Sequence, residues 1–240
     1  VGLYVVFAAL LLMQPDVGQT FLISTLWTAL FVLAGQPLAW VGVFAVIGAL
    51  GLVGAYMTLD YVRFRVDRFL APTGDEYSQT ARALQSFVEG GFFGRGPGEG
   101  TIKTALPDAH TDFIFAVIAE EYGAVTCLAL VALITFIVLR AYFRTFTETD
   151  PFTRLAVAGL SLLFGLQAAI NMGVNVGLLP AKGMTLPFIS AGGSSLVSTF
   201  LVMGIILALT RRRPDALRLR RPHSAFNTEP GMTALGSATR

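Results

Sequence analysis

The chain alternates long apolar stretches with short polar segments, and one polar segment is much longer than the others. The apolar stretches lie near residues 1–13, 20–35, 38–57, 113–139, 155–178 and 192–210. A helix that crosses a bilayer needs about 20 mostly apolar residues, so most of these stretches can span once tilt is allowed. The first is too short, lacks an initiator methionine, and lacks the charged start and cleavage site of a signal peptide. We therefore expect about six spans, with the first cut short and an N-terminal portion of the natural protein missing.

The composition supports a membrane protein of the all-α class. Of 240 residues, 54% are hydrophobic and 13% are charged, whereas about a quarter of the residues in a soluble domain are charged. The net charge of +2 is small and the basic residues are scattered, so no nucleic-acid partner is expected. The predicted fold is a polytopic bundle of transmembrane helices with a large extracytoplasmic loop at about 58–112. The single cysteine, Cys127, cannot form an intrachain disulfide and is expected to be a small buried hydrophobe.

Basic residues predict the orientation of the chain in the membrane. The segment "LTRRRPDALRLRR" follows the last apolar stretch, and the positive-inside rule assigns it to the cytoplasm. Counting spans backwards from there also puts the turn at 140–154 in the cytoplasm. The remaining connections then face outward: 14–19, 58–112 and 179–191.

The membrane domain is expected over residues 1–213. The following residues, 214–240, are polar and lack periodicity, so we expect a disordered cytoplasmic tail. The long loop should be partly ordered, because Ala81, Leu84, Phe87 and Val88 recur at helical spacing and predict an amphipathic helix on the membrane surface. The adjoining glycine cluster, "GGFFGRGPGEG", lacks the lysine and hydroxyl residue of a phosphate loop and is better explained by tight turns.

Three carboxylates lie at the start of the fourth apolar stretch and inside it, within "AHTDFIFAVIAEE". In a helix that runs from Asp112, Glu120 follows at i+8 on nearly the same face. A charge in the bilayer core costs about 2.5 to 3.5 kcal/mol on insertion scales, so Glu120 and Glu121 should have partners, structural or chemical. Asp112 is either an N-cap, which accepts backbone NH groups, or a functional carboxylate at the outer mouth.

A second polar pattern occupies the fifth stretch and the loop that follows. Three amides recur at i, i+4 and i+8, which favours hydrogen bonding between helices: Gln167, Asn171 and Asn175. Beyond them, "PAKGMTLPFISAGGSSL" contains Lys182, which either binds phosphate or snorkels to the membrane interface. Ser194 and Ser195 begin the last helix, where free NH groups favour an anion.

Four segments together resemble the SEDS family (FtsW, RodA and SpoVE) of bacterial cell-wall polymerases. In chain order they are "MQPDVGQTF", "RFRVDRFLAP", "LPDAHTDFIFAVIAEEYG" and "LLPAKGMTLPFISAGGSSL". The resemblance extends to about residue 213 and implies a ten-helix fold of which this chain is similar to the last six helices. The alanine in "ISAGGSS" and the stretch "TIKTALPDAHTDF" look more like the division-type members. Asp108 stands where many members have glutamate, and Ala191 where many have tyrosine.

The resemblance implies a peptidoglycan glycosyltransferase that polymerises lipid II on the outer face of the bacterial inner membrane during cell division. It implies Asp112 as the catalytic residue, which we interpret as the general base of an inverting reaction. Lys182 would offset the charge of the leaving pyrophosphate, with or without a divalent cation such as Mg²⁺ or Mn²⁺, for which no ligands are identified. The other candidate substrate-binding residues are Lys103, His110, Thr111, Ser194, Ser195 and Arg68.

The resemblance also implies partners. They are lipid II, the membrane lipids, a class B penicillin-binding transpeptidase and other division proteins. Two functions from other classes stay open on the sequence alone. In a transporter, or flippase, of lipid-linked precursors, Glu120, Glu121 and the amides would line a path. A non-catalytic scaffold would recruit a cell-wall synthase through its outer loop.

Overall fold

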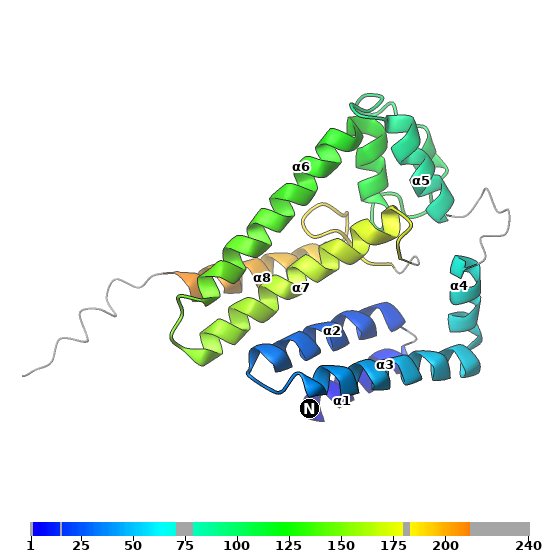
Figure 1. Cartoon of the computed structure of the whole chain (residues 1–240). Helices are drawn as coiled ribbons and strands as arrows, with labels where there is room; N and C mark the ends of the chain where they lie inside the picture. Colours follow the sequence, from blue (N-terminus) through cyan, green and yellow to red (C-terminus); the bar gives the residue numbers. More distant parts are fainter. Residues whose placement is uncertain (1, 15, 71–78, 180–182, 212–240) are drawn as a thin grey trace, which may run out of the picture. The chain divides into compact units, whose positions relative to one another are not determined.

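The computed structural model describes residues 2–14, 16–70, 79–179 and 183–211, and this part of the chain contains helices and no strands. Each of the six apolar stretches forms a helix: α1 (Gly2–Met13), α2 (Val17–Leu33), α3 (Ala39–Thr58), α6 (Ile114–Thr145), α7 (Pro151–Asn175) and α8 (Gly193–Thr210) (Figure 1). Of these helices, α3, α6, α7 and α8 are long and apolar enough to cross a membrane, whereas α1 and α2 are shorter. The predicted all-α membrane bundle is confirmed. The predicted disordered tail, 214–240, lies outside the described residues.

The long loop is partly helical, as predicted. It contains α4 (Asp60–Leu70), α5 (Gln79–Gly90) and the short 3-10 helix η1 (Ile102–Thr104). α4 was not predicted, because "DYVRFRVDRFL" mixes charged and apolar residues and reads as a loop beside the apolar spans. It is an amphipathic helix that packs against the end of α3.

The predicted amphipathic helix is present as α5. Its buried residues are Ala83, Ser86 and Gly90, whereas Leu84 is exposed and Val88 is 81% exposed. Small residues are needed where α5 approaches α6, since a Cβ at Gly90 would lie 1.9 Å from the carbonyl oxygen of Ala119. Of the larger apolar side chains, Phe87 packs against Phe115 of α6, with ring centroids 5.7 Å apart.

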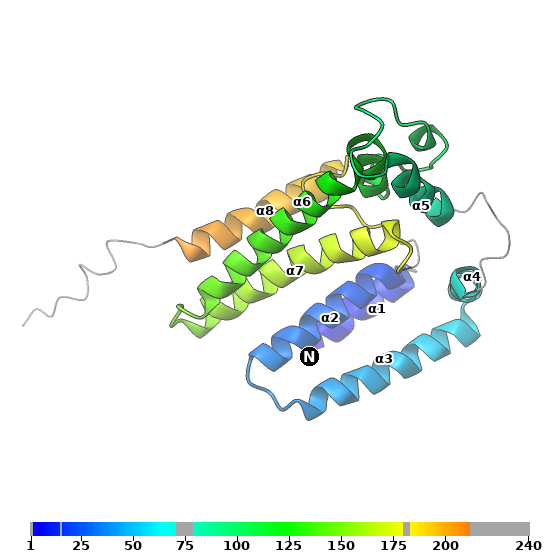
Figure 2. The same ribbon diagram turned by 45° about the horizontal axis from the view of Figure 1, so that its top comes forward.

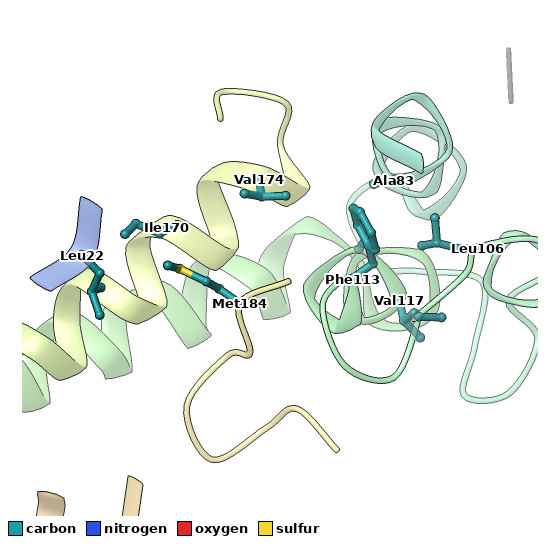
Figure 3. Packing of buried hydrophobic residues seen from close by; sticks show 10 residues of the cluster. Leu22, Ala83, Leu106, Phe113, Val117, Ile170, Val174 and Met184 are labelled. Atoms are coloured by element: carbon teal, nitrogen blue, oxygen red, sulfur yellow. The ribbon is translucent and has the colours of Figure 1, made fainter. Parts of the chain in front are cut away.

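α7 is the central helix of the described part. α2, α6 and α8 all pack against it, and α5 lies beside the first part of α6 (Figures 1 and 2). One cluster of buried side chains joins α2, α5, α6 and α7 to the loops before α6 and after α7 (Figure 3). Its members are Leu22, Ala83, Leu106, Ala109, Phe113, Ala116, Val117, Ile170, Val174 and Met184. Phe113 fixes the start of α6 in this core, directly beside Asp112.

α6 is interrupted at Gly123, whose φ of 80° and ψ of 176° are not helical. At the interruption, backbone groups of α6 have no hydrogen-bond partner within the helix, and they form hydrogen bonds with the glycine cluster instead. Ala124 donates its NH to the Gly91 carbonyl at 2.9 Å, and Arg95 donates its NH to the Glu120 carbonyl at 2.9 Å. The glycine cluster therefore turns tightly, as expected, and it also completes the hydrogen bonding of a broken membrane helix.

Candidate active site

Asp112 lies in the turn before α6 and not within the helix. α6 begins at Ile114, and its N-cap is Phe113, which makes no side-chain cap hydrogen bond. The N-cap role considered for Asp112 is therefore wrong, as is the stacking of Asp112 above Glu120 in one continuous helix. The cause is a left-handed residue upstream: Asp108 has φ of 56°, and its carbonyl accepts the Asp112 NH at 3.0 Å. The chain turns there and enters α6 at Ile114, two residues after Asp112.

The backbone of Asp112 is held by two amides from α7. Asn171 and Asn175 both donate Nδ2–H to the Asp112 carbonyl oxygen, at 2.8 and 2.9 Å. Asn171 also donates to the Met184 carbonyl at 2.5 Å, and Asn175 accepts the NH of Ala116 at 3.0 Å. Interhelical hydrogen bonding is confirmed for Asn175, which reaches Ala116 of α6, whereas the bonds to Asp112 and Met184 go to backbone carbonyls of loops. α7 thereby joins the start of α6 to the loop after α7.

The backbone carbonyls of the two residues before Asp112 accept hydrogen bonds from the segment that leads into α8. Ser190 donates Oγ–H to the Thr111 carbonyl at 2.6 Å and accepts the Leu186 NH at 2.6 Å. Ala191 donates its NH to the His110 carbonyl at 2.9 Å. Three consecutive carbonyls, those of residues 110 to 112, are thus fixed by other segments, so the position of the Asp112 backbone is set by tertiary structure.

The Asp112 carboxylate is half-buried and lies against the loop after α7. A Cβ on Gly183 would stand 3.5 Å from its Oδ2. Burial raises the pKa of the Asp112 carboxyl above its usual range, and the charge of Asp108 raises it further, whereas a hydrogen bond with the Thr111 side chain lowers it. The net shift moves this group toward the range in which a carboxylate is an effective proton acceptor near neutral pH.

Lys103 lies away from the Asp112 carboxylate. Its Nζ forms an ion pair with Glu121 Oε1 at 2.6 Å and donates to the Gly98 carbonyl at 3.0 Å. Because an α-helix rises 1.5 Å per residue, Glu121 lies about 10 Å along α6 from Ile114. The structure thus gives Lys103 an intramolecular partner away from the start of the helix.

Glu120 also has structural partners. Its side chain is completely buried, and Oε1 accepts the backbone NH groups of Thr101 at 2.6 Å and Ile102 at 2.9 Å. Oε2 has no hydrogen-bond partner in the described part of the chain. The expectation that Glu120 and Glu121 have partners is confirmed, and for both residues the partners belong to the outer loop.

The other predicted residues differ in how far the structure describes them. His110 is exposed, and its carbonyl is used as described above. Ser194 and Ser195 lie in the first turn of α8, as predicted, and Ser195 donates to the Gly192 carbonyl at 3.0 Å. Arg68 belongs to α4, but its side chain is outside the described part. Lys182 is also outside the described residues.

A metal site made of protein ligands alone is not found within the described residues, where no three or more His, Cys, Asp or Glu side chains come together. The carboxylates of Asp108 and Asp112 are close enough for one to raise the pKa of the other.

Ser190 and the link from the amides to Asp112 were missed by the sequence analysis. The pattern "NMGVN" indicated that Asn171 and Asn175 point in one direction, but not toward what. Ser190 carried no signal, because a serine at the end of a loop fits almost any turn.

Comparison with known proteins gives consistent matches. The chain matches the family model of FtsW, RodA and SpoVE, described as cell cycle proteins, over residues 1–214. A relative from Caulobacter vibrioides is 47% identical and one from Legionella pneumophila is 40% identical; both are named probable peptidoglycan glycosyltransferase FtsW. The matches cover 89% and 90% of this chain. The chain spans about half the length of these relatives, 55% and 57%.

A solved structure is also similar. It is described as showing the structural coordination of polymerization and crosslinking by a peptidoglycan synthase complex. The TM-score is 0.70 and the sequence identity is 30%, over 88% of this chain and 60% of that one. Sequence and backbone geometry therefore point to the same group of proteins.

Proposed function

The chain belongs to the FtsW/RodA/SpoVE family of cell cycle proteins, and on that basis we propose that the protein polymerises lipid II into peptidoglycan glycan strands during cell division. The relatives named as probable peptidoglycan glycosyltransferases support the activity. The observation that carries the proposal is the environment of Asp112. Its backbone is fixed by Asn171 and Asn175, but its half-buried carboxylate caps no helix.

The chemistry needs a proton acceptor. The acceptor sugar's hydroxyl must lose a proton as it attacks the anomeric carbon of the donor, and Asp112 takes that proton as general base. The raised pKa of Asp112 suits this role, because a base whose pKa lies closer to the working pH binds the proton more readily. One base and one activated leaving group suffice for a reaction that inverts the anomeric centre without a covalent intermediate.

The leaving group is a lipid pyrophosphate, so developing negative charge needs a cation. Lys182, one residue before Gly183, is proposed for this role, and the contact between Gly183 and Asp112 supports a shared site. A divalent cation such as Mg²⁺ or Mn²⁺ would further stabilise the pyrophosphate charge when bound. Asp112 is the residue proposed to hold it together with the substrate's oxygens. His110, Thr111, Ser194, Ser195 and Arg68 are the further residues proposed to contact substrate.

The proposed site faces the outside of the bacterial inner membrane. Residues 108–113, the end of α7 and the start of α8 are joined by hydrogen bonds and so belong to one end of these helices. The opposite end carries the basic residues Arg140, Arg144 and Arg154, and the arginine-rich segment that begins at Arg211 follows α8. The positive-inside rule favours that end in the cytoplasm.

A partner is proposed from the similar synthase complex. That complex is described as coordinating polymerization with crosslinking. We therefore expect a class B penicillin-binding transpeptidase, which crosslinks the strands that this protein makes, as the main partner, together with other division proteins.

The transporter alternative is less well supported. It needs Glu120 and Glu121 along an open path, but the first is buried against Thr101 and Ile102 and the second is paired with Lys103. The scaffold alternative is tested directly by Asp112→Asn. Asparagine keeps the size of the side chain but cannot accept the proton, so polymerisation of lipid II by the full-length protein should fall to background. Insertion and partner binding should persist, and an active Asp112→Asn protein would overturn the proposed function.

Lys182 is tested by two substitutions that differ in charge. Lys182→Arg should keep part of the polymerisation activity, because arginine keeps the charge but changes the reach. Lys182→Gln should lose most of it. If the two variants polymerise lipid II equally well and at near-normal rates, Lys182 only snorkels to the interface and the cation must come from elsewhere.

A further inference from the structure

We infer that Asn171 is a positioning residue that sets the distance between Asp112 and the segment that begins at Gly183. The inference rests on the proposed function, since it assumes that Asp112 is the general base. Asn171 touches no reacting atom in this role. It acts through the backbone of two segments that are far apart in the sequence and that must lie at a fixed separation for the reaction.

The side-chain amide of Asn171 bridges two segments of the chain. Its Nδ2 has two hydrogens, and it donates to the Asp112 carbonyl at 2.8 Å and to the Met184 carbonyl at 2.5 Å. Both donors are therefore used to bridge two segments. The side chain is almost completely buried, so water cannot easily replace either bond if the amide is removed.

Asn175 has different hydrogen-bond partners, so its structural role differs from that of Asn171. Asn175 donates to the Asp112 carbonyl and accepts the Ala116 NH. Both of those partners flank the start of α6, so Asn175 fixes Asp112 to its own helix. Only Asn171, of these two amides, joins Asp112 to the loop after α7.

The arrangement that depends on this bridge is the approach of Gly183 to the Asp112 carboxylate, where a Cβ on Gly183 would lie 3.5 Å from Oδ2. Met184 follows Gly183 directly, and Lys182 directly precedes it. Because α7 is a continuous helix here, the Asn171 side chain ties both segments to one point close to Asp112 and Gly183. The bonds from Ser190 and Ala191 join residues 110 and 111 to a more distant part of the same loop. Displacing a catalytic group by about 1 Å costs roughly a hundredfold in rate. Loss of the bridge should therefore lower the rate of the chemical step more than substrate binding.

The kinetic test compares Asn171→Leu with Gln167→Leu in the full-length protein. Gln167 lies one turn earlier on the same stripe of α7 and bonds only to Thr185, at 3.3 Å. For Asn171→Leu we expect kcat for lipid II polymerisation to fall about tenfold to a hundredfold, with KM changed by less than about threefold. For Gln167→Leu both constants should stay near those of the wild type. Equal effects of the two substitutions, or an unchanged kcat in Asn171→Leu, would overturn the inference.

A second readout does not depend on activity. Cysteines are introduced by Asp112→Cys and Gly183→Cys in a Cys127→Ala background, because a Cβ on Gly183 would lie 3.5 Å from Asp112 Oδ2, and disulfide formation between them reports on the separation of the two segments. The rate of disulfide formation should drop clearly when Asn171→Leu is added and should be unaffected by Gln167→Leu. An undiminished rate would overturn the coupling. If Asn171→Leu fails to insert, the nearly isosteric Asn171→Asp replaces it, because a carboxyl group has at most one hydrogen to donate and cannot bridge both carbonyls.

The two readouts also separate this inference from the proposed function. An active Asp112→Asn protein would remove Asp112 as the base and with it the kinetic meaning of the bridge. The disulfide rate would still decide whether Asn171 holds the two segments together.

Discussion

The carboxylate of Asp112 lies beside Gly183, a residue that has no side chain. A Cβ at that position would be 3.5 Å from Oδ2, and Gly183 has φ of +51°, in the left-handed region that favours glycine. A longer side chain at residue 183 would extend over the carboxylate. Glycine thus lets the loop after α7 approach Asp112 without placing a side chain against its carboxylate.

The first prediction concerns the pH dependence of polymerisation. A general base works only when it is deprotonated, so kcat/KM should rise with pH and level off above the pKa of Asp112, which burial and Asp108 raise. Asp108→Asn removes the neighbouring charge and should move the midpoint of this rise to lower pH. Asparagine tolerates the left-handed backbone at this position, so the turn should survive. The measurement is the pH profile of kcat/KM for both proteins.

Thr111→Val is the control, because it should move the midpoint of the pH profile in the opposite direction. A hydrogen bond with the Thr111 side chain lowers the Asp112 pKa, so its removal should move the midpoint to higher pH. Midpoints that move in the same direction in both variants, or in neither, would show that another group controls the profile.

The second prediction concerns the stability that Glu120 supplies. Glu120→Ala leaves the NH groups of Thr101 and Ile102 without their acceptor, and each buried unsatisfied group costs about 1 to 3 kcal/mol. Glu120→Gln keeps an acceptor oxygen at nearly the same place. We therefore expect a lower melting temperature for the alanine variant in detergent and a value close to wild type for the glutamine variant. Normal melting combined with lost activity in Glu120→Gln would instead give Glu120 a chemical role.

The third prediction concerns the contact between α5 and α6. Gly90→Ala would place a carbon 1.9 Å from the Ala119 carbonyl oxygen, which forces the two helices apart. Gly91→Ala meets no atom within 4 Å, and its φ of +55° costs only about 1 to 2 kcal/mol. Gly90→Ala should therefore lower the melting temperature or the yield much more than Gly91→Ala. Similar losses in the two variants would mean that backbone strain, and not the close approach, decides the stability here.

The sequence predicted the helices well and the site only in part. Long apolar stretches fix where spans begin and end to within a few residues, because the bilayer demands it. The apolar spacing predicted α5 but not which of its residues pack on α6, where Ala83 and Gly90 are buried. That face is set by the closeness of the neighbouring helix, which has no local signature in the sequence.

The position of Asp112 shows a second kind of limit. Its residue type and location at a helix mouth were sufficient to make it a candidate, but its distance from the helix depends on the left-handed turn at Asp108, an aspartate that local rules permit there and do not require. The bonds from Asn171 and Ser190 are tertiary. They join segments 59 and 79 residues apart along the chain, and no pattern in the sequence of either segment specifies its partner.

The last prediction concerns Lys103, which was a candidate for substrate binding and is paired with Glu121 in the structure. If the pair is structural, Lys103→Met leaves a largely buried carboxylate without its cation and should lower the melting temperature. The reversed pair, Lys103→Glu with Glu121→Lys, should recover much of the loss. Arg95, which pairs with Glu89 at a more exposed position of the same loop, is the matched control. Arg95→Met should change stability by only about 0 to 1 kcal/mol. Polymerisation then separates the two roles. A reversed pair that is both stable and active confines Lys103 to holding the loop on α6, whereas one that melts normally but no longer polymerises lipid II would return Lys103 to the substrate site, because only a cation at residue 103 itself could then account for the loss.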